Sequence, residues 1–172
     1  MKNILETERL ILRETTINDA PFIMALLNSK GWLQFIGDRN VRNIVGAENY
    51  IAERFLKSYI DNGFGLYLVA IKLSNTSIGM CGLIKRETLE NIDIGFAFLP
   101  EYSGFGYAFE AAKATKQFAF ETLKINRFVA ITTPDNVSSI KLLEKIGMQF
   151  EKKFLFEEKE ELFLFGLSNN QF

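Results

Sequence analysis

Hydrophobic residues in the first half of the chain recur at spacings that predict one short strand, two helices and a pair of strands. Between positions 46 and 62 the apolar residues fall three or four positions apart, as on one face of a helix, and Gly63 ends the run. Pro21 lies where helices often begin. The two β-rich runs are separated by the turn residues 74–77. We predict a strand at 9–13, a helix at 18–27, an irregular loop over 31–43, a helix at 46–62, and strands at 66–73 and 78–85.

The second half alternates strands and helices more regularly. Pro100 stops a β-rich run, and a helical pattern begins soon after it, with apolar and charged residues on opposite faces. Asn136 is a good N-cap for a shorter helix that Gly147 ends. The predicted elements are strands at 91–99 and 127–132, helices at 107–123 and 136–146, and a closing hairpin of strands 150–156 and 162–167 around the acidic turn 157–161. This order predicts a mixed sheet of the α/β (α+β) class.

Length and composition limit the kinds of protein that this chain can be. Its 172 residues are 48% hydrophobic and 24% charged, which suits a single globular domain over residues 1–172. The formal net charge of −1, without a basic run, argues against a nucleic-acid partner. No apolar segment approaches the length of a membrane span, and a lone Cys81 suits a reducing compartment. We therefore expect a cytoplasmic monomer or homodimer that binds neither nucleic acid nor membrane.

The most informative segment for chemistry is the loop of Ser103, Gly104, Phe105, Gly106, Tyr107 and Ala108, which runs directly into a predicted helix. Free backbone N–H groups at the positive end of a helix bind anions, and glycines let a ligand approach the backbone closely. A plain tight turn is the simpler alternative. The dinucleotide fingerprint fails because Phe109 stands where a third small residue is needed, and the lysine of a phosphate-binding P-loop is absent.

Together with the strands on either side and the Asn-capped helix, this loop resembles the GNAT superfamily of acyl-CoA-dependent N-acetyltransferases. That family carries Gln or Arg, two residues, Gly, one residue, then Gly or Ala. Gly106 and Ala108 match the end of this motif, and Ser103 stands where Gln or Arg is usual. The segments 8–13 and 100–111 look like the branch that acetylates the N-termini of ribosomal proteins, a branch that also contains many small-molecule acetyltransferases.

The resemblance implies a mostly antiparallel sheet of about seven strands, splayed between strands 91–99 and 127–132 and flanked by about four helices. It implies acetyl-CoA as cofactor, with the pyrophosphate on residues 103–108 and the pantetheine arm along the backbone near Phe96 and Phe98. Asn136 would contact the pantetheine or the adenine-side arm, or serve only as a helix cap. A backbone N–H near Phe96 would polarise the thioester carbonyl. The activity implied is direct transfer of the acetyl group to a primary amine, on a small molecule or a peptide N-terminus.

Two side chains are candidates for catalysis in a chain without histidine. Asp93 stands on the predicted central strand, where the family often carries a Glu as general base, with Glu87 and Glu90 as weaker alternatives. It could instead be a solvated strand residue or bind substrate only. Many relatives use a Tyr to protonate the leaving thiolate, but Leu143 stands at that position. Ser139 is the nearest hydroxyl, either as this acid or as part of the helix cap.

Other readings of the sequence stay open at this point. The missing Tyr and the missing Gln or Arg would also suit a non-catalytic acyl-CoA-binding module of the same fold, and an unrelated nucleotide-binding domain is a third possibility. We expect no metal site and an inert Cys81. Trp32 and Phe35 could line an acceptor pocket or form a surface patch. The acceptor pocket is expected between the loop 29–43, the C-terminal end of helix 46–62 and the closing hairpin.

Overall fold

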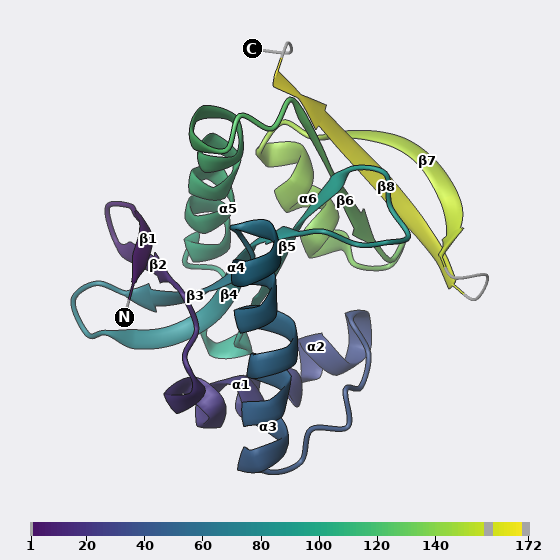
Figure 1. Ribbon diagram of the computed structural model, residues 1–172. Helices are drawn as coiled ribbons and strands as arrows, with labels where there is room; N and C mark the ends of the chain where they lie inside the picture. Colours follow the sequence, from purple (N-terminus) through teal and green to yellow (C-terminus); the bar gives the residue numbers. More distant parts are fainter. Residues whose placement is uncertain (1, 157–159, 170–172) are drawn as a thin grey trace.

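The computed structural model of the chain, shown in Figure 1, describes residues 2–156 and 160–169. Its strands are β1 (Asn3–Glu6), β2 (Leu10–Arg13), β3 (Leu66–Ile71), β4 (Thr76–Ile84), β5 (Ile92–Phe98), β6 (Arg127–Thr132), β7 (Gln149–Phe156) and β8 (Glu160–Ser168). They form one sheet in the order β1-β2-β3-β4-β5-β6-β8-β7. Every neighbouring pair is antiparallel except β5 and β6, which are parallel. The expected mixed, mostly antiparallel sheet is confirmed.

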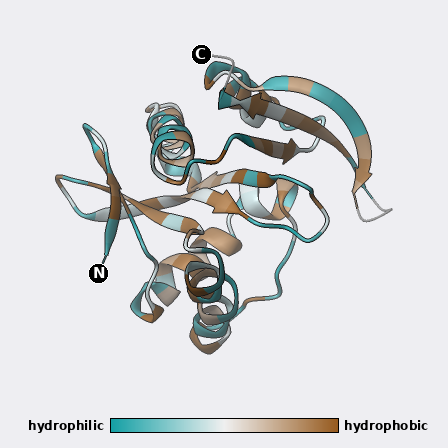
Figure 2. Ribbon diagram, turned by 45° about the horizontal axis from the view of Figure 1, so that its top comes forward, coloured by the Kyte–Doolittle hydropathy of each residue, from teal (hydrophilic) through white to brown (hydrophobic). Residues whose placement is uncertain are grey.

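Helices cover both faces of this sheet. They are α1 (Ala20–Leu27), α2 (Lys30–Phe35), α3 (Ile44–Tyr50), α4 (Lys57–Asn62), α5 (Tyr107–Gln117) and α6 (Val137–Lys145), with π-helical segments η2 (Ile51–Leu56) and η4 (Phe118–Thr122). Because η2 joins α3 to α4 and η4 extends α5, the described residues form five helices where about four were expected. Figure 2 shows α5 on one side of the sheet and α1–α4 on the other.

Two hydrophobic cores result, one on each face. The core under α5 and α6 includes Cys81, Ile94, Phe128 and Phe165, and the core under α1–α4 includes Trp32, Phe55 and Met80. Burial of apolar surface of this kind is the main force that holds helices on a sheet. The predicted burial of Cys81 is confirmed. This burial raises the pKa of the Cys81 thiol to about 12.

The sheet opens between β5 and β6. These two strands pair only where they begin, at Ile92 with Phe128 and at Asp93 with Val129, whereas β6 pairs with β8 over its whole length. Beyond Asp93 the edge of β5 that faces β6 therefore has unpaired backbone groups, which an extended ligand can bind as a neighbouring strand would. The splay implied by the family resemblance is confirmed.

The structure corrects three predictions from the sequence. Strand β1 was missed because its four residues are only partly buried and show no alternating pattern. The prediction of loop over 31–43 was wrong at its start, where α2 forms: a six-residue helix is too short to be stable alone, and the packing of Trp32 against the core holds it in place. The sheet has eight strands rather than seven. Most of the predicted turn 157–161 lies outside the described residues.

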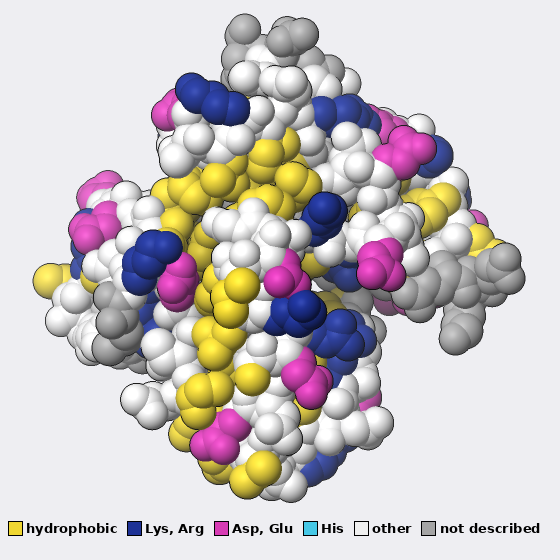
Figure 3. Space-filling view, in the orientation of Figure 1, with side chains coloured by type: hydrophobic (Ala, Val, Ile, Leu, Met, Phe, Trp, Pro, Cys, Tyr) yellow, Lys and Arg dark blue, Asp and Glu magenta, His cyan; other side chains and the backbone are white. Residues whose placement is uncertain are grey.

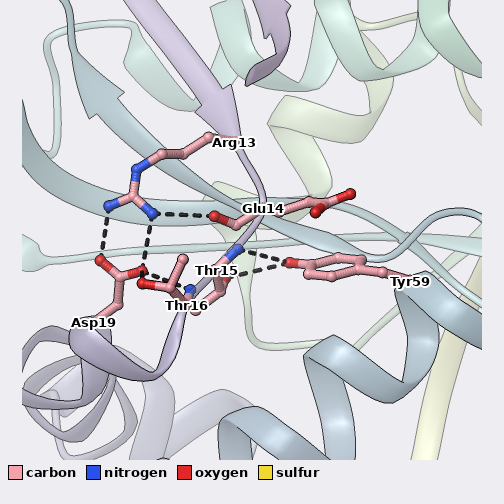
Figure 4. A network of polar contacts seen from close by, with 6 residues as sticks. All are labelled: Arg13, Glu14, Thr15, Thr16, Asp19 and Tyr59. Carbon is pink, nitrogen blue, oxygen red and sulfur yellow. Dashed lines mark hydrogen bonds and ion pairs between the residues drawn. The ribbon is translucent and has the colours of Figure 1, made fainter. Parts of the chain in front are cut away.

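A network of polar contacts joins the end of β2 to α1 and α4 (Figure 4). The guanidinium of Arg13 donates to both carboxylate oxygens of Asp19, at 2.9 and 2.7 Å, and both side chains are nearly buried. The Tyr59 hydroxyl accepts a hydrogen bond from the backbone N–H of Thr15 and donates to the backbone oxygen of Leu66. Bidentate pairs of this kind fix direction as well as distance. The network sets how the α1–α4 layer sits on the sheet.

Replacing Asp19 by Asn should lower the free energy of unfolding by about 3 kcal/mol, because it leaves the Arg13 charge buried without a partner. Burial acts to raise the pKa of Asp19, but hydrogen bonds from Arg13 and Thr16 outweigh it and hold the pKa below its ordinary value. The stabilisation is thus present above about pH 4 and is lost as the pH falls through the lowered pKa. Urea unfolding from pH 3 to 7 measures it. As a control, Asp61→Asn removes the exposed ion pair with Lys57 and should lower the free energy of unfolding by under about 1 kcal/mol. Equal losses in the Asp19 and Asp61 variants would contradict the prediction.

Candidate active site

The loop that the sequence singled out lies at the C-terminal end of β5 and leads into α5. Gly104 and Gly106 have φ angles of +84° and +81°, which side chains other than glycine rarely adopt. The first helical bond runs from the Glu110 N–H to the Gly106 oxygen, and the backbone N–H groups of residues 104–109 make no hydrogen bond with any described residue. Nothing within 4 Å would meet a Cβ at Gly104. The loop is thus an open cradle of N–H donors at a helix N-terminus, which fits a pyrophosphate.

Arg9 braces this cradle from the turn between β1 and β2. Its guanidinium binds the Glu110 carboxylate at 2.7 Å, donates to the Phe105 backbone oxygen at 3.0 Å and lies over the Tyr107 ring. Thr7 and the Arg9 backbone N–H also donate to Glu110. Sequence reasoning noted Arg9 only as part of a family-like segment, since the partners lie about 100 positions apart. The brace fixes the loop and adds a positive charge beside it.

A hollow of about 290 Å³ adjoins the same loop, beside Arg9 and Tyr107. Lys72, half-buried, lies in its wall and forms a 3.3 Å ion pair with Glu6. Both cations of this hollow are paired with carboxylates, Arg9 with Glu110 and Lys72 with Glu6, and Glu8 lines the hollow as well. The lining residues are Glu8, Arg9, Ile71, Lys72, Leu73 and Tyr107.

Asn136 and Ser139 lie across the opening, where α6 begins after β6. Parallel strands end at the same edge of a sheet, so the start of α6 and the loop 103–108 share that edge. Asn136 Oδ1 accepts from the Ser139 backbone N–H at 3.2 Å and from the Ser138 hydroxyl at 3.0 Å, so the predicted N-cap is confirmed. The Asn136 amide NH₂ and the Ser139 hydroxyl make no hydrogen bond with the described residues, which leaves both groups free for a ligand.

Asp93 lies at the other end of β5, where the strand begins to part from β6. It is 1% exposed, so the alternative of a solvated strand residue was wrong. Arg86, just beyond β4, donates from Nε to Asp93 Oδ2 at 2.6 Å, and the buried Oδ1 has no well-formed hydrogen bond with any described residue. Burial raises the pKa of Asp93 to about 6, against the opposing charge and hydrogen bond of Arg86 and the weaker effect of the Ile131 backbone N–H. Such a value suits a group that exchanges protons near neutral pH.

The structure separates the predicted residues into two groups. Ser103–Ala108, Asn136 and Ser139 lie around the C-terminal ends of β5 and β6, whereas Asp93 lies near the N-terminal end of β5, about 17 Å from Phe98 by strand rise. No hydrogen bond or ion pair joins Asp93 to Ser139 among the described residues. Phe96 and Phe98 pack against the core under α5, and Ala97 packs against the core under α1–α4, because successive side chains of a strand point to opposite faces of the sheet.

A second hollow, of about 240 Å³, lies on the Asp93 side of the opening. Its walls come from the loop before β5 and from the closing hairpin of β7 and β8, and Val129, the sheet partner of Asp93, forms part of its floor. Sequence reasoning gave the hairpin a part in the acceptor pocket and named Glu90 only as an alternative base; it singled out none of the other lining residues. The lining residues are Thr88, Leu89, Glu90, Asn91, Val129, Lys152, Phe154 and Leu164.

Other buried polar atoms without hydrogen bonds occur among the described residues. They are the Trp32 indole N–H, the Thr133 hydroxyl and the Ser29 hydroxyl. Thr133 directly follows β6, at the edge where Asn136 lies. Trp32 is 5% exposed and packs in the core under α1–α4, which agrees with the alternative of a surface segment tied down by one aromatic side chain. A buried polar group without a hydrogen bond lowers the stability of the protein, and a ligand that supplies the missing hydrogen bond binds more tightly for that reason.

Comparisons with known proteins agree with this geometry. Residues 9–149 match the family described as Acetyltransferase (GNAT) domain. The chain is 27% identical over 154 residues to the uncharacterized N-acetyltransferase YnaD of Bacillus subtilis, across 87% of this chain and 85% of YnaD. The GNAT-family acetyltransferase structure from Bacillus anthracis has a TM-score of 0.82 at 23% identity, covering 97% of this chain and 99% of that one. RimL, a ribosomal L7/L12 alpha-N-protein acetyltransferase solved with coenzyme A, has a TM-score of 0.83 at 18% identity, covering 97% and 98%.

The chain therefore belongs to the GNAT acetyltransferase family. It is an acyl-CoA-dependent N-acetyltransferase that uses acetyl-CoA, as the loop motif and its flanking strands predicted. At 18% identity, RimL shows that the two proteins share a fold. The third possibility, an unrelated nucleotide-binding domain, was wrong.

Two further findings concern residues 2–156 and 160–169. Within them no helix is both long and apolar enough to cross a membrane. The same residues contain no group of three or more His, Cys, Asp or Glu side chains placed to hold a metal ion.

Proposed function

We propose that the chain acetylates a primary amine that enters from the Asp93 side, while acetyl-CoA enters from the opposite edge of the sheet. The observation that carries this proposal is the pair of unsatisfied backbone surfaces along one strand: the free N–H groups of residues 104–109 and the unpaired edge of β5. The first fits a pyrophosphate, and the second fits an extended pantetheine arm. Bound acetyl-CoA supplies a thioester whose carbonyl carbon the amine attacks.

Each residue then has a role that follows from its position. Asp93 takes a proton from the incoming ammonium, and Arg86 holds the carboxylate in place. A backbone N–H near Phe96, on the free edge of β5, donates to the carbonyl oxygen of the acetyl group. The free amide of Asn136 binds the pantetheine arm, and the Ser139 hydroxyl is the candidate donor to the leaving sulfur. Holding both substrates on one strand supplies a large part of the rate by itself.

The acceptor pocket lies, on this proposal, between three segments that flank Asp93. These are the segment 29–43, the C-terminal end of helix 46–62 and the closing hairpin. The hollow of about 240 Å³ beside the hairpin supports this position. Trp32 supports it as well, because this residue of α2 is buried in the core against which Ala97 of β5 packs, so the segment 29–43 is held close to β5. We place the reaction in the cytoplasm, because the lone, buried and unpaired Cys81 suits a reducing compartment.

The test is the release of free thiol from acetyl-CoA in the presence of amines. The panel contains free amino acids, amidated peptides with different N-terminal residues, and spermidine. We expect turnover with at least one acceptor and calorimetric binding of coenzyme A. Binding of coenzyme A without turnover across the panel would contradict acetyl transfer and favour the alternative, a non-catalytic acyl-CoA-binding module.

A further inference from the structure

Three arginines act electrostatically on one tyrosine, Tyr50, on the acceptor side of β5. Tyr50, the last residue of α3, is half-buried, with its ring edge-on to Phe55 at 5.5 Å between centroids. Arg39 follows α2, Arg54 lies in η2 and Arg86 follows β4, so the three charges come from separate parts of the chain. Burial raises the pKa of the Tyr50 hydroxyl, and the three positive charges act to lower it, with Arg39 also approaching as a hydrogen-bond donor.

Two of these arginines have no partner for their charge. Arg39 and Arg54 are exposed and form no ion pair with any described residue, whereas Arg42 pairs with Asp38 and Lys57 pairs with Asp61. Figure 3 shows Lys and Arg side chains gathered just below the centre of this face, where Figure 1 draws α2 beside the long α3–η2–α4 helix. Acidic residues occur in the same segments, but the described ion pairs there are those of Asp38 with Arg42 and of Asp61 with Lys57, so Arg39 and Arg54 remain cations without an ion pair among the described residues.

Arg86 connects this patch to the reaction site. Its guanidinium binds the Asp93 carboxylate at 2.6 Å and also acts on the Tyr50 hydroxyl. Asp93 lies where β5 and β6 part, so a group held by Arg39 and Arg54 would lie near the point that the acceptor amine must reach. The cradle at residues 103–108 is at the far end of β5, so these arginines are not positioned to hold the pyrophosphate.

We propose that Arg39, Arg54 and Tyr50 bind a carboxylate of the acceptor, so that the substrate is an amine that also carries a carboxylate. This inference rests on the proposed acetyl transfer and adds the class of its acceptor. Guanidinium groups bind carboxylates with paired, charge-assisted hydrogen bonds, and the Tyr50 hydroxyl can donate a further one. A polyamine is disfavoured, because its charges would meet unpaired arginines.

Pairs of acceptors that differ only in the carboxylate test this proposal and separate its two sources. Alanine against alaninamide examines a free amino acid. A C-terminally amidated peptide beginning with Glu, against the same peptide beginning with Gln, examines an acidic N-terminus. In at least one pair the acid should have a kcat/KM at least about tenfold above its amide, as expected for a hydrogen-bonded ion pair. Equal or better turnover of the neutral member in both pairs, or preferred turnover of spermidine, would overturn the proposal.

Variants then connect the preference to the patch. Arg39→Gln with Arg54→Gln should raise the KM of the preferred acid at least about tenfold and leave the KM of its amide unchanged. The matched controls Arg42→Gln and Lys57→Gln remove a paired charge from the same two segments and should change neither KM. An acid preference that survives in the double variant would also overturn the proposal.

A separate binding measurement distinguishes failure of this inference from failure of the proposed function. Calorimetry of the same acids and amides onto the protein loaded with coenzyme A reports recognition without chemistry. Acid-selective binding that disappears in the double variant supports the patch even where no thiol is released. Turnover without acid selectivity supports acetyl transfer and overturns the patch. Absence of acid-selective binding in a protein that also releases no thiol counts against both.

Discussion

Replacing Asp93 by Asn is expected to lower kcat at least about 100-fold while the affinity for coenzyme A stays nearly unchanged, as for the loss of a general base. The substitution keeps the size of the side chain and removes its charge. Asp93 lies at the start of β5, far from the phosphate cradle, so cofactor binding has no direct reason to change. Burial and the pairing with Arg86 hold the carboxylate in one position on the acceptor side.

The pH profile gives the second part of this prediction. The pKa of Asp93 is raised to about 6, and a base must be deprotonated to accept a proton. The kcat of the wild-type protein should therefore rise with pH through about 6, and this limb should disappear in the Asn variant. Glu87→Gln, an exposed carboxylate in the same loop region, serves as the control and should keep both rate and profile. An unchanged kcat with a raised acceptor KM would show that Asp93 positions substrate rather than acting as a base.

The substitution Gly106→Glu should weaken the binding of coenzyme A at least about 100-fold, since like charges about 4 Å apart near a surface repel by about 4 kcal/mol. The new side chain would enter the cradle of N–H groups at residues 104–109 and place a carboxylate beside the pyrophosphate. Only Arg9 Nη2, at 3.5 Å, lies within 4 Å of the position of the new Cβ, so the fold has room for it. Calorimetry with coenzyme A measures the change.

A matched control separates the effect of the added charge on cofactor binding from the effect of backbone strain. Gly147 has a φ angle of +97° and open space around it, and it lies at the C-terminal end of α6, away from the cradle. Gly147→Glu adds the same charge at a similar conformational cost of about 1–2 kcal/mol and should leave the affinity unchanged. Arg9→Gln should give an intermediate loss of about tenfold, because it removes the charge beside the cradle and its brace to Glu110. An unchanged affinity in folded Gly106→Glu would contradict the site.

Local pattern was enough for most of the secondary structure. The strands at β2–β8 and the helices at α1, α5 and α6 were predicted close to their positions, because apolar spacing, caps and turn residues are all local signals. Strand β1 and helix α2 were missed because neither carries such a signal: one is held by pairing with β2 and the other by burial of Trp32.

The sequence by itself determined the class of the fold, and it predicted the glycine loop as the phosphate site and Asp93 as a candidate base. Each follows from residues close together in the chain and from the resemblance to the GNAT family. Only the tertiary structure decided that Arg9 braces this loop through Glu110 and that Arg86 pairs with the buried Asp93. It also decided that three arginines from separate segments of the chain act on Tyr50. The physical reason is that charge pairing and burial act between groups that are close in space, and separation along the chain does not show which groups the sheet will bring together.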